Sequence, residues 1–112
     1  MKKIEVIVKK SKFNEVKEEL HKAGLIFFCY WDVTGSGNEI QKWFYRSVSY
    51  TSSEIQKRWL SIVVENSLLD KTVEVLLNSA HTGRVGDGKI FVSNIEESFR
   101  IRTIEDGYDA LK

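Results

Sequence analysis

Residues 55–95 read IQKRWLSIVVENSLLDKTVEVLLNSAHTGRVGDGKIFVSNI, and this stretch decides the fold. Its two ends, residues 55–64 and 89–95, are rich in β-branched and aromatic residues and predict strands. Apolar residues recur between them at helical spacing and predict an amphipathic helix: Leu69, Val73, Leu76, Leu77 and Ala80. A glycine-rich turn then leads back into a strand, so the stretch is a strand–helix–strand unit.

The preceding half of the chain repeats this order. Residues 2–9 alternate between apolar and charged side chains, which predicts a half-buried strand. Apolar residues at helical spacing follow, and Gly24 ends that helix. Residues 25–33 (LIFFCYWDV) are apolar on both faces and predict a central strand.

The complete order predicts an α+β protein of the ferredoxin-like type, β-α-β-(long loop)-β-α-β. Such folds have an antiparallel sheet with both helices on one face. The other face must also be covered. It is made apolar by Tyr30 or Trp31, together with Trp59 and Phe91, which favours oligomerisation.

Length and composition limit the classes of protein. The 112 residues predict a single domain over 1–112, and the net charge of +1 argues against non-specific nucleic-acid binding. A lone cysteine, Cys29, excludes a disulfide framework and a zinc cluster and favours a reducing compartment. The charged opening is unlike a signal peptide, and no apolar run has transmembrane length. We therefore expect a cytoplasmic protein without membrane insertion.

The connection between the two halves, residues 35–54, is unusually long for a compact domain. It is polar and serine-rich, yet it contains Trp43, Phe44 and Tyr50. Long connections are usually functional. Trp43 and Phe44 either contact a partner or associate with each other within the loop.

The second glycine cluster, residues 82–88, predicts a phosphate site. Successive glycines allow backbone N–H groups to converge on an anion, and Lys89 adds a positive charge. Arg100 and Arg102 follow on a segment expected to be extended, which would place both guanidinium groups on one side. The alternative is a tight helix-to-strand turn with a solvated lysine. A P-loop is excluded, because Ile90 replaces the required Ser or Thr and the loop follows a helix.

Together these motifs closely resemble the P-II family of nitrogen-regulatory signalling proteins. The resemblance rests on TGRVGDGKIFV at residues 82–92, RIRT at 100–103, the GSG at 35–37, the YR at 45–46 with Tyr50, and the opening MKKI with Lys9. It implies a homotrimer of ferredoxin-like subunits that binds ATP or ADP in the clefts between subunits. It also implies a signalling protein without a catalytic site.

The resemblance further implies which residues bind the nucleotide. Phosphate-binding positions are matched by Gly86, Asp87, Gly88 and Lys89, with Arg100 and Arg102 contributed across the cleft, and by Gly37 and Asn38 at the start of the long connection. Gly35 is a further nucleotide-binding position. Cys29 and Val63 match positions near the adenine. The segment at about 37–54 matches the mobile T-loop, which docks an ammonium channel or enzymes of nitrogen and carbon metabolism.

Two departures from the family concern 2-oxoglutarate, which many members bind through ATP-bound magnesium. Glu39 stands where a glutamine is usual, and its charge opposes a dianionic ligand, whereas the matching Lys57 is present. Asn38 replaces an arginine. The alternative is therefore a divergent sensor of adenine nucleotides, or of another small molecule, without a 2-oxoglutarate response. Tyr50 matches a uridylylated tyrosine, and its alternative role is packing within the loop.

Two other classes share parts of the pattern. An RNA-recognition domain has this fold, but residues 88–92 only faintly match its aromatic motif. For an enzyme, His21 is interpreted as a surface residue and His81 has no evident Asp or Ser partner. Cys29 is interpreted as a small core residue. We therefore expect no dedicated enzyme.

Overall fold

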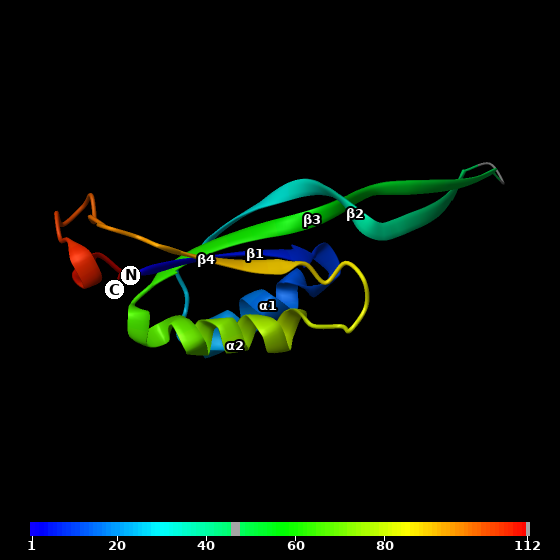
Figure 1. The fold of residues 1–112 in the computed structure, drawn as a ribbon. Coiled ribbons are helices and arrows are strands. Elements are labelled where there is room, and N and C mark those ends of the chain that lie inside the picture. Colours follow the sequence, from blue (N-terminus) through cyan, green and yellow to red (C-terminus); the bar gives the residue numbers. More distant parts are fainter. Residues whose placement is uncertain (46–47, 112) are drawn as a thin grey trace.

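The computed structural model describes residues 1–45 and 48–111, and it describes side chains outside residues 37–54. The elements are β1 (Lys2–Lys9), α1 (Lys10–Lys22), β2 (Cys29–Tyr45), β3 (Val48–Val64), α2 (Leu69–Ala80) and β4 (Lys89–Asn94), with short 3-10 helices at Asn66–Leu68 and Gly107–Leu111. Figure 1 shows both α-helices on one side of a single sheet. Neither described α-helix is long and apolar enough to cross a membrane.

The sheet has the order β2-β3-β1-β4, and all three strand pairs are antiparallel. This topology confirms the predicted ferredoxin-like α+β fold. The strand predicted at residues 25–33 differs in two respects, because it begins only at Cys29 and lies at the edge of the sheet. The strand is apolar on both faces because each face makes ring contacts. The Tyr30 ring lies 4.6 Å from Phe13 on the helix side, and Trp31 stacks on Trp59 on the other side.

The long connection also differs from a simple loop. The structure continues β2 to Tyr45 and β3 back from Val48, so most of the segment forms the two arms of an antiparallel hairpin. The pairing has an irregularity between Ser36 and Gln41. In Figure 1 this hairpin extends well beyond the helices. The predicted T-loop is therefore strand-paired along most of its length.

The core lies between the sheet and the two helices. Ile4, Val6 and Val8 project from alternate positions of β1, and their burial confirms the predicted half-buried strand. They pack with apolar residues of β3 and of the helices, which include Phe13, Val16, Leu20, Leu60, Ile62 and Leu76. Burying each such side chain stabilises the fold by about 1.5–3 kcal/mol.

Helix α1 ends as the sequence predicts. Gly24 has a φ of 82°, a left-handed conformation that suits glycine. Its N–H donates to His21 O at 3.0 Å, and the N–H of Leu25 donates to Leu20 O at 2.9 Å. This is the Schellman pattern, with the accompanying contact between the two leucines in the core.

The face of the sheet opposite the helices carries three stacked rings. Trp59 lies 6.1 Å from Trp31 and 6.3 Å from Phe91, with interplanar angles of 13° and 16°. The indole N–H of Trp59 donates to Glu5 Oε2 at 2.8 Å. Trp31, rather than Tyr30, therefore makes this face apolar. Trp31 and Phe91 are nearly half exposed, so in a single chain the face is incompletely covered.

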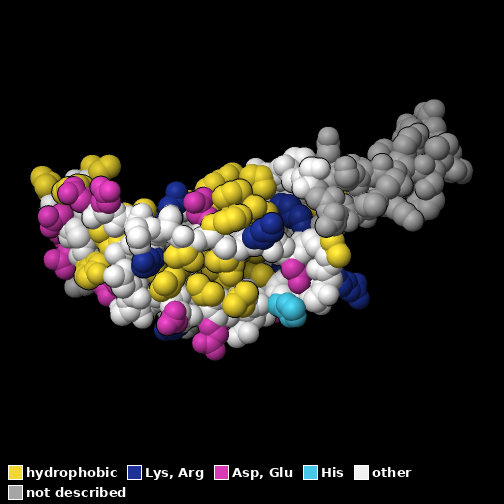
Figure 2. Space-filling view, in the orientation of Figure 1, with side chains coloured by type: hydrophobic (Ala, Val, Ile, Leu, Met, Phe, Trp, Pro, Cys, Tyr) yellow, Lys and Arg dark blue, Asp and Glu magenta, His cyan; other side chains and the backbone are white. Residues whose placement is uncertain are grey.

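A second apolar region lies between α2 and β4. Leu77 and Val92 are both about half exposed, at 56% and 46%. Figure 2 shows hydrophobic side chains gathered across the middle of this side of the molecule. Leu77 was grouped with the buried face of its helix by spacing alone, and the structure instead leaves it at the margin of that face.

Candidate functional site: two half-sites at opposite ends of the sheet

The second glycine loop, residues 81–88, connects the end of α2 to the start of β4. Asp87 organises it from within. The backbone N–H groups of Thr82 and Gly83 donate to Asp87 Oδ2 at 2.8 and 2.9 Å, and the Thr82 hydroxyl donates to Asp87 Oδ1. The N–H of Arg84 donates to Thr82 Oγ1 at 3.2 Å. One carboxylate thus fixes the path of the loop across five residues.

These contacts also set the charge of the loop. The hydrogen bonds from the side chain and the backbone of Thr82 hold the pKa of Asp87 well below its usual range. Lys9 Nζ lies 3.5 Å from Asp87 Oδ1, and His81 Nδ1 lies 3.7 Å from Oδ2. The sequence had indicated no acidic partner for His81, and the structure provides one because the loop folds back on itself. The ammonium group of Lys9 on β1 therefore balances the negative charge of Asp87.

Gly88 is required by close packing. Its φ is 98°, and a Cβ added there would lie 1.6 Å from the carbonyl oxygen of Ile7 on β1. No side chain can be accommodated at that distance without displacing the backbone. The glycine therefore allows the loop to lie directly against the central strand, and it places Lys89 as the first residue of β4.

Lys57 connects this loop to the base of the hairpin. It lies on β3 and is 7% exposed. Its ammonium group donates to the carbonyl oxygen of Gly86. Gly35, on the paired strand β2, would place a Cβ 3.8 Å from Lys57 Cγ. Lys57 and Gly35 are therefore brought together with the glycine loop, although they lie far from it in the sequence.

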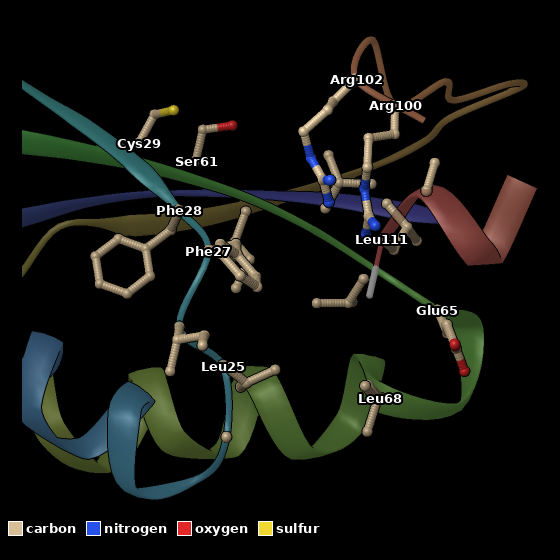
Figure 3. Close-up of a pocket in the computed structure, with 16 residues that line it drawn as sticks. Leu25, Phe27, Phe28, Cys29, Ser61, Glu65, Leu68, Arg100, Arg102 and Leu111 are labelled. Carbon is tan, nitrogen blue, oxygen red and sulfur yellow. The ribbon is translucent and has the colours of Figure 1, made fainter. Parts of the chain in front are cut away.

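A hollow of about 1000 Å³ lies at the other end of the sheet. Four of the residues singled out in the sequence line it: Cys29, Val63, Arg100 and Arg102. Figure 3 shows the two arginine side chains projecting side by side into this hollow. The hollow thus combines a pair of guanidinium groups with a wall that is mostly apolar.

The segment that carries the arginines is not extended, contrary to the sequence expectation. Residues 101–103 form a turn, and the N–H of Ile104 donates to Arg100 O at 2.7 Å. Ile104 has a φ of 59°, which is unfavourable for a β-branched residue. Arg100 is held by Glu105 Oε1 and the carbonyl oxygen of Asp109, each at 3.3 Å. The two arginines share a side because of this turn and not because of strand alternation.

Several lining residues had no signal in the sequence. Phe27, Phe28, Ser61, Leu68 and Leu111 all border the hollow. An exposed aromatic residue after a helix-ending glycine could have drawn attention to Phe27, but only the fold reveals its exposure. Cys29, which was interpreted as a core residue, is exposed, because it belongs to an edge strand and lies on the side away from the helices.

The two regions lie too far apart to act together within one chain. Lys89 pairs with Ile7 at one end of β1, and Asn94 pairs with Lys2 at the other end. Six strand residues span roughly 20 Å, and further chain separates Asn94 from Arg100. Figure 1 places the glycine loop and the C-terminal turn on opposite sides of the molecule. A small ligand therefore cannot contact both regions of the same chain.

Several residues singled out in the sequence lie outside the part whose side chains are described: Gly37, Asn38, Glu39, Trp43, Phe44 and Tyr50. Among the described residues, no group of three His, Cys, Asp or Glu side chains could hold a metal ion.

The fold and these two regions define a ferredoxin-like protein with a glycine-rich loop at one end of its sheet and an arginine-lined hollow at the other. The family profile of "Nitrogen regulatory protein P-II" matches residues 1–105. The chain is 43% identical to the nitrogen regulatory protein P-II of Azospirillum brasilense and 38% identical to that of Haemophilus influenzae, in each case over 99% of this chain and 100% of the relative. A solved structure of B. subtilis GlnK superposes with a TM-score of 0.80 at 31% identity, covering 98% of this chain and 97% of that one.

The chain therefore belongs to the P-II family of nitrogen regulatory proteins. This membership confirms the resemblance identified from the glycine loop and the RIRT motif. It also confirms the prediction of a nitrogen-regulatory signalling protein that acts as a regulator and not as an enzyme.

Proposed function

We propose that the single domain of residues 1–112 assembles as a homotrimer and binds ATP or ADP in the clefts between its chains. The observation that carries this proposal is the separation of the two half-sites. An anionic ligand held by both Lys89 and Arg102 requires the glycine loop of one chain to face the hollow of the next. A head-to-tail contact of this kind closes into a ring when the rotation allows.

In this arrangement the polyphosphate lies between the two half-sites. The backbone amides near Gly86 and Gly88, together with Lys89, bind it from one chain, and Arg100 and Arg102 bind it from the neighbour. Bidentate guanidinium contacts are well suited to phosphate oxygens. Asp87 was expected among the phosphate contacts. We assign it instead to holding the loop, because its oxygens already accept from Thr82 and Gly83.

The adenine is expected in the hollow of the second chain. Cys29 and Val63 line its wall, in agreement with the positions implied by the family. Magnesium would accompany ATP through its phosphates, where it supplies positive charge. Glu39 is the candidate protein ligand for that ion, and Gly37 and Asn38 are the candidate phosphate contacts at the start of the hairpin.

The hairpin of β2 and β3 is proposed as the surface that docks partners. Its base is connected to the glycine loop through Lys57 and Gly86. A nucleotide at that loop can therefore favour one hairpin arrangement over another through differential contacts. The partner classes are an ammonium channel or enzymes of nitrogen metabolism, and the compartment is the cytoplasm. Modification of Tyr50 would act on the same hairpin.

A response to 2-oxoglutarate distinguishes two versions of this proposal. Lys57 is the expected partner of that ligand, but in the structure its ammonium group donates to Gly86 O. Together with Glu39, this favours a sensor of adenine nucleotides without a 2-oxoglutarate response. Calorimetry of ATP and magnesium, with and without 2-oxoglutarate, tests this version. We expect equal ATP affinities, and clear synergy between the two ligands would contradict it.

The site between chains can be tested by complementation. Lys89→Ala removes a proposed phosphate contact of the glycine loop only, and Arg102→Ala removes a proposed phosphate contact of the hollow only. Each variant alone should bind ATP about 10-fold more weakly or worse, while remaining trimeric in light scattering. Randomly mixed trimers of the two variants should regain about a quarter of the intact clefts, since each cleft takes its halves from different chains.

A site contained within one chain would recover nothing on mixing. That outcome, or unchanged ATP affinity in both single variants, would refute the site assignment. A wild-type chain that is monomeric and binds no adenine nucleotide would refute the proposed function as a whole.

A further inference from the structure

Phe27 is a large aromatic residue that remains mostly in solvent. Its side chain is 70% exposed, whereas most large apolar side chains of the sheet and helices are buried or half-buried. It lies in the segment that connects Gly24 to β2, and it borders the same hollow as Arg100 and Arg102. Exposing most of a phenyl ring to water is unfavourable, so we expect a ligand or a partner to cover the Phe27 side chain.

The neighbouring residue Phe28 provides a comparison, because its ring has a structural role. The Phe28 ring lies 5.5 Å from His21 and 6.4 Å from Tyr30, and it packs against the core. Figure 3 shows the side chains of Phe27 and Phe28 projecting to different sides, with Phe27 toward the arginines. Phe28 therefore packs against the core, whereas Phe27 faces the hollow and is available to a ligand.

The hollow itself indicates the chemistry of its ligand. One part carries the guanidinium groups of Arg100 and Arg102, which favour an anion. The remainder is largely apolar, with Leu25, Leu68 and Leu111 in its lining. A ligand that joins an anionic group to a flat, weakly polar ring fits both parts. Nucleotides have this composition, and aromatic side chains bind their bases by stacking.

We propose that Phe27 is the stacking platform for the adenine base and determines much of the affinity for the nucleotide. The inference rests on the proposed function, and it adds a residue that the family resemblance did not indicate. The base covers the exposed ring, while the arginines bind the phosphates that extend toward the neighbouring chain. The alternative is that a second copy of this chain covers the Phe27 ring in place of the base, and the experiment below distinguishes these two possibilities.

The test compares Phe27→Ala and Phe27→Tyr with the control Leu77→Ala. Leu77 is a comparably exposed apolar residue, at 56%, but it lies on α2 outside the hollow. ATP affinity is measured by calorimetry, and the mass of the assembly is measured by light scattering. Base–aromatic stacking of about 1–3 kcal/mol predicts a loss of about 10-fold or more for Phe27→Ala. Phe27→Tyr and Leu77→Ala should remain within about threefold of wild type, since each keeps a six-membered aromatic ring at residue 27.

A second measurement does not depend on affinity. In protein with labelled phenylalanine, the ring signals of Phe27, assigned by their loss in Phe27→Tyr, should shift on addition of ATP and show cross-relaxation with the adenine protons. Wild-type affinity in Phe27→Ala, or the absence of that cross-relaxation, would overturn the inference while the proposed function stands. Dissociation of the trimer by Phe27→Ala would instead assign the ring to the contact between chains. Failure of the wild-type protein to bind ATP would refute the proposed function first.

Discussion

The glycine loop and the arginine hollow, the two regions proposed to bind the nucleotide phosphates, are built in opposite ways. The loop is a compact backbone structure, fixed by the Asp87 carboxylate and by the close approach of Gly88 to Ile7. The hollow is wide and presents the long side chains of Arg100 and Arg102 over a mostly apolar wall. If both regions bind the nucleotide as proposed, affinity should depend on backbone shape in the loop and on side-chain chemistry in the hollow. Substitutions should therefore affect stability and binding together in the loop, whereas substitution of the exposed Arg102 in the hollow should affect binding alone.

The largest effect is expected from Gly88→Ala. The new Cβ would lie 1.6 Å from Ile7 O, so the loop and β1 would have to separate. We expect a loss of about 4 kcal/mol or more in the free energy of unfolding, together with loss of ATP binding. Thermal and urea denaturation measure the first effect, and calorimetry measures the second.

Gly83→Ala is the matched control. Gly83 also has a positive φ, of 80°, but the nearest atom to its added Cβ is His81 Nε2 at 3.8 Å. Backbone strain alone costs about 1–2 kcal/mol. Equal losses in the two variants would mean that close packing against β1 is not what the loop requires.

A smaller effect, confined to binding, is expected from Arg102→Ala in the hollow. Arg102 is exposed, so its removal should change the free energy of unfolding by less than about 0.5 kcal/mol. Loss of a charged phosphate contact should weaken ATP binding by about 10-fold or more. Arg100→Ala provides the contrast, because Arg100 also contacts Glu105 and the carbonyl oxygen of Asp109, and it should lower stability as well. Equal melting temperatures for the two variants would contradict this difference.

The pH dependence of stability should reveal the role of Asp87 in the loop. Its pKa in the folded protein is lowered by hydrogen bonds from Thr82, so its contribution is present above the ordinary carboxyl pKa of about 4 and is lost as pH falls below it. Asp87→Asn removes this contribution. Denaturation curves should therefore show a less stable variant at pH 7, with the difference from wild type narrowing toward pH 3. A difference that is constant across this range would exclude the carboxylate as the cause.

The smallest effect is expected from Cys29→Ser. Cys29 is exposed and lines the hollow, and serine preserves its size. ATP affinity should stay within about threefold of wild type in a calorimetric titration. A loss of ATP affinity of 10-fold or more would show that the Cys29 thiol itself contributes to binding, beyond its contribution to the shape of the wall.

The success of sequence analysis differed between the two regions for a physical reason. The glycine loop between the second helix and the last strand could be predicted from residues 82–89, because its glycines and the lysine are adjacent in the chain. The contributions of Lys57 and Ile7 to the same loop could not, because each arrives through strand pairing. In the hollow, the two arginines were predicted to share a side, but the expected extended backbone was wrong. A turn with a left-handed Ile104 is not evident from residue spacing.

By itself, the sequence determined the order of the elements, the periodicity of β1 and α1, the end of α1 at Gly24 and the family. These properties depend on residues that are close together in the chain, where spacing and glycine conformation act directly. Only the tertiary structure decided that β2 is an edge strand, that Phe27 and Cys29 are exposed, and that the glycine loop and the arginine hollow lie at opposite ends of the sheet. Those properties depend on which strands pair, and pairing is a long-range choice made by the packing of the whole core.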